Sequence, residues 1–112
     1  MRSTGMKIIY NNIIPFPGFK AINLFGVLFV RKGCTMSESD INHEMIHTFQ
    51  MKEMGYVMFY LWYLVEWLIK LVKLGDSNKA YRAISFEREA YGNEKNLTYT
   101  ITREKYAWRK LI

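Results

Sequence analysis

The chain has little of several residue types, and each shortage narrows what it can be. Its 112 residues contain one cysteine, Cys34, so an internal disulfide is excluded and a reducing compartment, the cytoplasm, is expected. Residues 1–12 carry no long apolar run behind their basic residues, so no secretory signal is expected. Acidic residues are few, with ten against sixteen lysines and arginines. No glycine-rich phosphate-binding loop and no zinc-finger pattern accompanies this positive charge, so nucleic acid is not expected as a partner.

Histidine is also scarce, because the chain has only two, and both lie in the stretch HEMIH at residues 43–47. On a helix, this spacing places His43 and His47 on one face a turn apart, where both can bind one metal ion. Glu44 lies one step round the helix and can reach a water on that ion without being a ligand. The pattern predicts a zinc site with a general base. The alternative is a helix with two surface histidines one turn apart.

The first third of the chain has the composition of β-strands. Residues 6–16 are rich in β-branched and aromatic side chains and end in a proline–glycine turn signal, and residues 19–32 form a second apolar run before Gly33. This pattern predicts an antiparallel hairpin over residues 6–33 with both faces covered, and a bulge or close backbone approach at Gly26. The second strand either only covers the helices or offers an open edge to an extended peptide beside the metal.

Two helices are expected next. Ser37 and Asp40 form a capping-box pattern, so a helix is expected from Glu38 to Met54, ending at Gly55. Residues 56–74 form an aromatic helix that is apolar on most sides. Glu66 interrupts it, and a carboxylate at mid-bilayer costs about 3 kcal/mol, so a spanning segment is disfavoured. Membrane-surface contact or self-association through this helix is expected instead.

A further helix is expected over residues 77–95, and a short amphipathic helix over residues 99–112. Glu87 falls on the small apolar stripe of the first of these, together with Ala80, Ala83 and Ala90. A carboxylate on such a face must be paired or bind a metal. Glu89 points away from this stripe and is expected in solvent.

The third zinc ligand is predicted to be Glu87. A tetrahedral catalytic zinc takes three protein ligands, and the chain has no third histidine and no suitable cysteine pair. With a rise of about 1.5 Å per residue through two antiparallel helix connections, Glu87 reaches a height between those of His43 and His47. The alternative for Glu87 is a buried ion pair with Arg82 or Lys70.

The segments HEMIH and EREAY, residues 43–47 and 87–91, resemble the gluzincin metallopeptidases. The closest resemblance is to the minigluzincins and to the soluble core of the prenyl-protease and heat-shock membrane proteases. In those families the first Glu of an E-x-x-A-D segment binds zinc, which implies this role for Glu87, with Ala90 at the alanine. Tyr91 replaces the aspartate that steadies a histidine ligand there.

The length predicts a single domain over residues 1–112, and the expected elements give an α+β fold with a short antiparallel sheet packed on three to four helices. The resemblance, which covers roughly residues 19–95 by order of elements, implies that this domain is zincin-like. Some minigluzincins are latent, which implies that residues 99–112 could cover the cleft. The expected function is zinc-dependent (Zn²⁺) hydrolysis of a peptide or protein substrate, with Glu44 as general base. Tyr91, Tyr81 and Arg82 are candidates for stabilising the oxyanion or supporting the ligands.

Two other functions are compatible with these residues. The chain could be a latent or inactive metal-binding module that acts through its aromatic helix in membrane or protein association. It could also be a helical membrane or partner-binding protein without a metal, in which case HEMIH is accidental.

Overall fold

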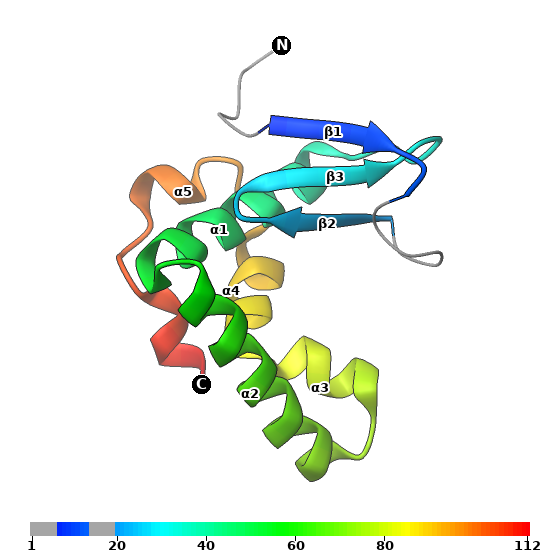
Figure 1. Cartoon of the computed structure of the whole chain (residues 1–112). Helices are drawn as coiled ribbons and strands as arrows, with labels where there is room; N and C mark the ends of the chain where they lie inside the picture. Colours follow the sequence, from blue (N-terminus) through cyan, green and yellow to red (C-terminus); the bar gives the residue numbers. More distant parts are fainter. Residues whose placement is uncertain (1–6, 14–19) are drawn as a thin grey trace.

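A computed structural model describes residues 7–13 and 20–112 and shows an α+β fold, so the fold class expected from the sequence is confirmed (Figure 1). The sheet contains β1 (Lys7–Asn11), β2 (Ala21–Leu24) and β3 (Val27–Arg31), in the order β1-β3-β2. β2 is antiparallel to β3, but β1 is parallel to it. The expected pairing over residues 6–33 is therefore wrong: the run 19–32, expected as one strand, is itself the hairpin of β2 and β3, and β1 adds to it in parallel. The turn expected at residues 15–18 lies outside the described residues.

The hairpin of β2 and β3 closes through the two-residue turn Phe25-Gly26, whose φ angles of 53° and 88° both lie in the left-handed region. Such a turn matches the twist of the strands it joins. It sets Ile22 opposite Phe29, on the face away from fully buried Leu28. Only one face of the sheet is therefore fully buried, against the expectation of two covered faces. Gly26 is a turn residue rather than a bulge.

α1 (Glu38–Met54) has the bounds expected from its capping residues. Ser37 Oγ accepts from the N–H of Asp40, and Asp40 Oδ2 accepts from the N–H of Ser37, each at 3.0 Å. At the other end, Gly55 adopts a φ of 69° and its N–H bonds to the carbonyl of Met51. Both ends are therefore fixed, which holds the residues between them in regular helix.

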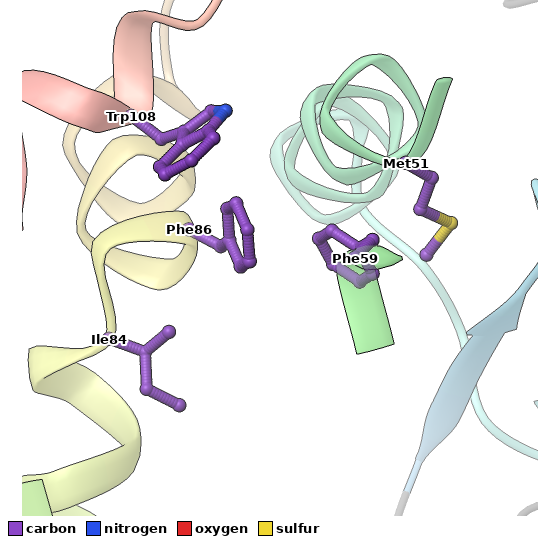
Figure 2. Close-up of a cluster of buried hydrophobic side chains, with 5 residues drawn as sticks. All are labelled: Met51, Phe59, Ile84, Phe86 and Trp108. Carbon is purple, nitrogen blue, oxygen red and sulfur yellow. The ribbon is translucent and has the colours of Figure 1, made fainter. Parts of the chain in front are cut away.

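α2 (Val57–Leu74) supplies one wall of the hydrophobic core, which Figure 2 shows. The ring of Phe59 packs against Phe86 with centroids 4.5 Å apart, and Phe86 packs against Trp108 at 4.8 Å. The core joins residues distant in sequence, and its buried members are Met51, Phe59, Ile84, Phe86 and Trp108. Within the part of the chain that the structure describes, no helix has both the length and the apolarity needed to cross a bilayer.

The single helix expected over residues 77–95 is two helices, α3 (Ser77–Ala83) and α4 (Ser85–Asn93). Ile84 between them is extended, with φ −62° and ψ 136°. The break has a polar cause, because the buried carboxylate of Glu66 accepts from the backbone N–H of Ser85 at 2.9 Å and from its hydroxyl. The indole of Trp62 also donates to Glu66, at 2.7 Å. Glu66 thus caps α4.

The C-terminal helix expected over residues 99–112 is also interrupted. It is divided into α5 (Tyr99–Thr102) and a 3-10 helix, η1 (Ala107–Leu111). Between them Arg103 turns inward and contacts the carboxylates of Glu53 and Glu89. The N–H of Tyr106 donates to Glu53 at 2.7 Å. These contacts hold the segment against α1 and α4 and bring Trp108 into the core.

Candidate metal centre

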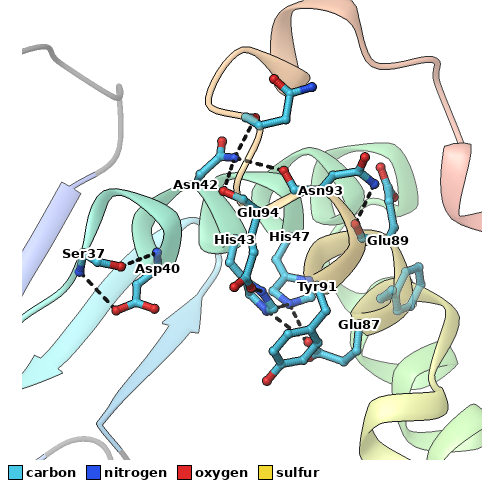
Figure 3. Close-up of polar contacts among 12 residues, drawn as sticks. Ser37, Asp40, Asn42, His43, His47, Glu87, Glu89, Tyr91, Asn93 and Glu94 are labelled. Atoms are coloured by element: carbon cyan, nitrogen blue, oxygen red, sulfur yellow. Dashed lines mark hydrogen bonds and ion pairs between the residues drawn. The ribbon is translucent and has the colours of Figure 1, made fainter.

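Three buried side chains meet between α1 and α4 (Figure 3). Nε2 of His43 and Nε2 of His47 each lie 3.1 Å from Oε1 of Glu87, and the two nitrogens are 3.1 Å apart. All three residues are less than 7% exposed. The structure thus brings together the three residues that the sequence analysis selected as metal ligands, although Glu87 lies 40 residues from His47 and 44 from His43 in sequence.

The other nitrogen of His43 faces a carboxylate. Its Nδ1 lies 2.8 Å from Oε1 of Glu94, at the end of α4. A carboxylate accepts hydrogen bonds and does not donate them, so Glu94 can take the Nδ1 proton of His43 and leave Nε2 free for a metal, whereas without a metal Nε2 can donate to Glu87. Glu94 thus contacts His43 where the gluzincin resemblance would place an aspartate. Tyr91 instead contacts the imidazole of His43 with its ring, centroids 4.5 Å apart.

His47 has a similar arrangement, in which an uncharged amide takes the place of the carboxylate. Its Nδ1 lies 2.7 Å from Oε1 of Gln50, one turn along α1. The amide nitrogen of Gln50 donates to the carbonyl of Phe86 at 3.0 Å and to Glu89 at 2.9 Å. Since both of those atoms are acceptors, the Gln50 amide is oriented with its oxygen towards His47, where it can accept the Nδ1 proton. Nε2 of His47 is therefore the nitrogen that faces the triad.

When both histidines carry a single proton on Nδ1, the triad presents three acceptor atoms 3.1 Å apart. Such a set needs a positive charge among its atoms, from a metal ion or from a proton on a histidine. Ligand atoms about 2.0–2.1 Å from a tetrahedral zinc are about 3.3 Å apart, close to the separations here. Two imidazoles with one carboxylate also form a donor set found in catalytic zinc sites. The residues present fit a zinc ion.

Without a metal, the charge of Glu87 acts on its neighbours. Burial disfavours the charged imidazole of His47, but the charge and hydrogen bond of Glu87 outweigh it and raise the pKa of His47 to about 9. Burial alone would raise the pKa of Glu87, but the positive charge of His47 and hydrogen bonds from both histidines hold it well below its usual range. The site thus attracts one positive charge, which either a proton or a metal ion can supply.

The second oxygen of Glu87 is held by α2. The hydroxyl of Tyr63 donates to Oε2 of Glu87 at 2.6 Å, and burial raises the pKa of this phenol, so it remains a donor. Among the described residues, the ion-pair partners of Glu87 are the two histidines, and neither Arg82 nor Lys70 pairs with it. The two cations named as examples for the alternative therefore do not pair with Glu87, and an ion pair with protonated His47 is the form of that alternative that the geometry allows.

Asn42 fixes the distance between the two helices that carry the ligands. Its side-chain nitrogen donates to the carbonyls of Asn93, Glu94 and Asn96, at 3.3, 2.8 and 2.9 Å. Asn42 immediately precedes His43, and these carbonyls end α4 (Figure 3). The side chain of Asn42 therefore provides a hydrogen-bond donor for the carbonyls at the C-terminal end of α4 and holds this end beside His43.

Beside the triad lies an open cleft of about 250 Å³. It is lined by Lys20, Ala21, Met36, Asp40, His43, Glu44, Tyr81, Tyr91 and Glu94. Burial raises the pKa of Glu44, against the lowering effect of the nearby histidines. The hydroxyls of Tyr81 and Tyr91 are 3.0 Å apart. Arg82 lies outside this lining and stacks its guanidinium 3.7 Å from the centre of the Tyr91 ring.

No protein-family model, curated protein or solved structure matches this chain. The resemblance to gluzincins therefore depends on the motifs HEMIH and EREAY and on the chemistry of the triad. Family membership stays a prediction.

Sequence reasoning missed three residues around the triad. Glu94 shares a helix stripe with Glu87, two turns on, and that spacing is a signal that could have identified it. Tyr63 could not be singled out from the sequence, because it is one of many aromatic residues in its helix. Glu89 was expected in solvent, but it is 1% exposed and binds Gln50 and Arg103, so that expectation is wrong. Its partner Arg103 lies 14 residues away, in a segment whose local pattern does not indicate the contact.

Proposed function

We propose that this chain is a zinc-dependent peptidase in which His43, His47 and Glu87 hold the metal. The observation that supports this most strongly is that Glu94 and Gln50 face the Nδ1 atoms of the two histidines, while both Nε2 atoms and an oxygen of Glu87 converge beside an open cleft. Zinc at such a site supplies a Lewis acid and lowers the pKa of water towards about 7.

Glu44 is the general base in this proposal. It follows His43 in α1 and lines the cleft, but it is not one of the three clustered ligands. Its carboxylate takes a proton from the attacking water and passes it to the leaving amine. The backbone carbonyl of Glu44 accepts from the side chain of Asn23 at 3.1 Å, and Asn23 also donates to Thr48 at 3.1 Å, so β2 holds this turn of α1 in place.

The substrate is an extended peptide that adds to the free edge of β2. Bonded pairs alternate along an antiparallel ladder, and the N–H of Arg31 donates to the carbonyl of Lys20 across the sheet. The N–H and carbonyl of the next residue, Ala21, therefore point away from β3. Ala21 also lines the cleft together with His43 and Glu44. A peptide bonded to Ala21 would lie beside the general base.

Tyr81 and Tyr91 are the proposed donors to the oxyanion. Both line the cleft, and burial raises the pKa of Tyr81, so its hydroxyl stays protonated at neutral pH. Arg82 acts only through Tyr91, whose ring it covers. A phenol that donates to developing negative charge stabilises the transition state more than the ground state.

The substitution Glu44→Gln tests the proposal. It removes the base and leaves the ligands, so zinc content should stay at one per chain while cleavage of denatured casein falls at least about a hundredfold. Glu38→Gln, on the exposed first turn of the same helix, is the matched control and should change neither.

A wild-type protein that binds zinc but cleaves no peptide would favour the alternative of a latent or inactive module acting through α2. A protein that stays empty after dialysis against zinc would contradict the metal site itself. We also propose a cytoplasmic location, because Cys34 is a free thiol.

A further inference from the structure

An open cavity of about 470 Å³ lies where α2, α3 and α4 meet, away from the metal triad. Its volume falls within the range of small-molecule sites. Two small residues, Asn78 and Ala83, line it together with four cationic side chains: Lys70, Lys79, Arg82 and Arg88. No carboxylate is among these residues, and none of them lines the cleft beside the triad. We call this site the basic cavity.

The positive charges of the basic cavity have no counter-charge within the described part of the chain. Among those residues, none of the four cations forms an ion pair with an acid. The acids on the same three helices have other roles: Glu66 caps α4, and Glu87 belongs to the triad. Asp76 caps α3 by accepting from the backbone N–H of Lys79. The four charges therefore repel one another, and an anion among them would relieve that repulsion.

Arg82 is held with its hydrogen-bonding groups free. Its guanidinium stacks on the Tyr91 ring, 3.7 Å from the ring centre, and Tyr91 in turn packs against His43. Stacking uses a face of the planar guanidinium, so it fixes the group without using its N–H donors. Within the described residues, no acceptor bonds to these donors. A fixed fork of free N–H groups matches two oxygens of one phosphate group.

Arg88 is also held in place without losing its charge. One of its N–H groups donates to the backbone carbonyl of Leu111, which is a neutral acceptor. The two arginines thus reach the cavity from α3 and α4, while the half-buried Lys70 reaches it from α2 and Lys79 from α3. Four cations on three helices are more than one phosphate group would contact, which favours a ligand with linked phosphates.

We propose that the basic cavity binds a small soluble molecule that carries two or more linked phosphate groups, such as a di- or triphosphate. Arg82 binds one phosphate through paired N–H bonds, and Lys70 and Lys79 act as point charges on its neighbour. The site uses none of the metal-binding residues, so it does not depend on the proposed hydrolysis.

Calorimetric titration of the full-length chain with inorganic pyrophosphate tests the proposal. Metal is first removed on a chelating resin, so that the phosphates cannot bind through zinc. We expect one pyrophosphate per chain, and inorganic phosphate should bind at least about tenfold more weakly because it makes fewer charge-assisted hydrogen bonds.

Two matched double variants locate the contact. Lys79→Gln with Arg82→Gln should weaken pyrophosphate binding at least about tenfold. Lys95→Gln with Lys105→Gln removes the same charge from exposed positions outside the cavity and should change the affinity less than about twofold. Arg82→Lys keeps the charge but loses the planar fork, so it should bind several-fold more weakly than wild type.

Three results would overturn the proposal. The wild type could fail to bind pyrophosphate at millimolar concentration, or it could bind inorganic phosphate equally well. Equal weakening by the two double variants would show that net charge alone attracts the anion and that the cavity is only a solvated basic surface.

Discussion

The acceptors behind the two histidines decide what the triad can bind. Nδ1 of His43 faces Glu94, and Nδ1 of His47 faces Gln50. Such partners fix the tautomer of a ligating histidine and raise its basicity. The residues behind the ligands are therefore as important to the proposed site as the ligands themselves.

Glu94→Ala should weaken zinc binding by about 10–100-fold, because Nδ1 of His43 loses its acceptor and the ring loses its fixed orientation. Competition with a chromophoric chelator measures this affinity. Glu104→Ala is the matched control, since its side chain is 72% exposed and pairs only with Lys110. Equal zinc affinities for the two variants would contradict the role given to Glu94.

The metal-free protein should lose stability as the pH rises. The pKa of His47 is about 9 in the folded state against 6.5 for the free side chain. The folded state therefore holds the proton more tightly, and the stabilisation is complete below pH 6.5 and lost as the pH rises through 9. The free energy of unfolding in chelator should fall by up to about 3 kcal/mol across this window.

Chemical denaturation at the two ends of the window measures this change. Glu87→Gln removes the charge that raises the pKa of His47, so its unfolding free energy should depend much less on pH. Zinc-loaded wild type should not show the loss either, because its ligands must already be deprotonated. A metal-free wild type that is equally stable at both pH values would refute this electrostatic description.

At the residue scale, the sequence predicted which three side chains meet in the triad but not the residues that support them. The two histidines and Glu44 share one local motif, and Glu87 followed from its apolar stripe and the shortage of other donors, whereas the helix-rise estimate assumed one continuous helix that the structure breaks at Ile84. Glu89 was wrongly predicted to be exposed, because a charged residue off the apolar stripe of a helix is normally solvated. Only the tertiary contact with Arg103 explains its burial.

At the scale of elements, the break between α3 and α4 positions Glu87. Glu66 of α2 caps the new helix start at Ser85, and Glu87 then falls in the first turn of α4. A negative charge in the first turn of a helix is favoured by the helix dipole. The interruption of the apolar pattern in α2 is thus part of the support for the site.

Glu66→Ala should destabilise the protein by about 3 kcal/mol, because the buried N–H of Ser85 and the indole N–H of Trp62 lose their acceptor. Urea denaturation measures the change. Glu38→Ala removes an exposed glutamate from the first turn of α1 and should cost less than about 1 kcal/mol. A loss below 1 kcal/mol for Glu66→Ala would show that α4 does not need this cap.

The elements differ in how well the sequence predicted them. α1 was predictable at both ends, since a capping box and a C-cap glycine act locally. The break at Ile84 was not, because its cause lies 19 residues away in Glu66. The parallel pairing of β1 was missed for a similar reason, since β2 and β3 pair through a local turn, whereas β1 occupies the other edge of β3 from a distant part of the chain.

At the scale of the whole molecule, Arg103 ties the C-terminal segment to both ligand helices. Its guanidinium contacts Glu53 of α1 at 2.7 and 2.9 Å, and it also binds Glu89 of α4. Glu89 in turn accepts from Gln50, which orients His47. Residues 99–111 therefore pack on α1 and α4, and the lining of the cleft comes from residues 20–94.

Arg103→Ala should destabilise the fold by about 3–5 kcal/mol, since two buried carboxylates lose their counter-charge. Thermal and urea unfolding measure the effect. Lys110→Ala removes the exposed pair with Glu104 and should cost no more than about 1 kcal/mol. If the two variants were equally stable, the buried network would not hold the C-terminal segment.

Zinc-loaded crystals, with anomalous diffraction recorded on both sides of the zinc absorption edge, would locate the ion without reference to activity. We expect one strong anomalous peak per chain, bound by Nε2 of His43, Nε2 of His47 and a carboxylate oxygen of Glu87. A peak at another position, or crystals that take up no zinc while the three side chains keep their places, would contradict the metal centre described here.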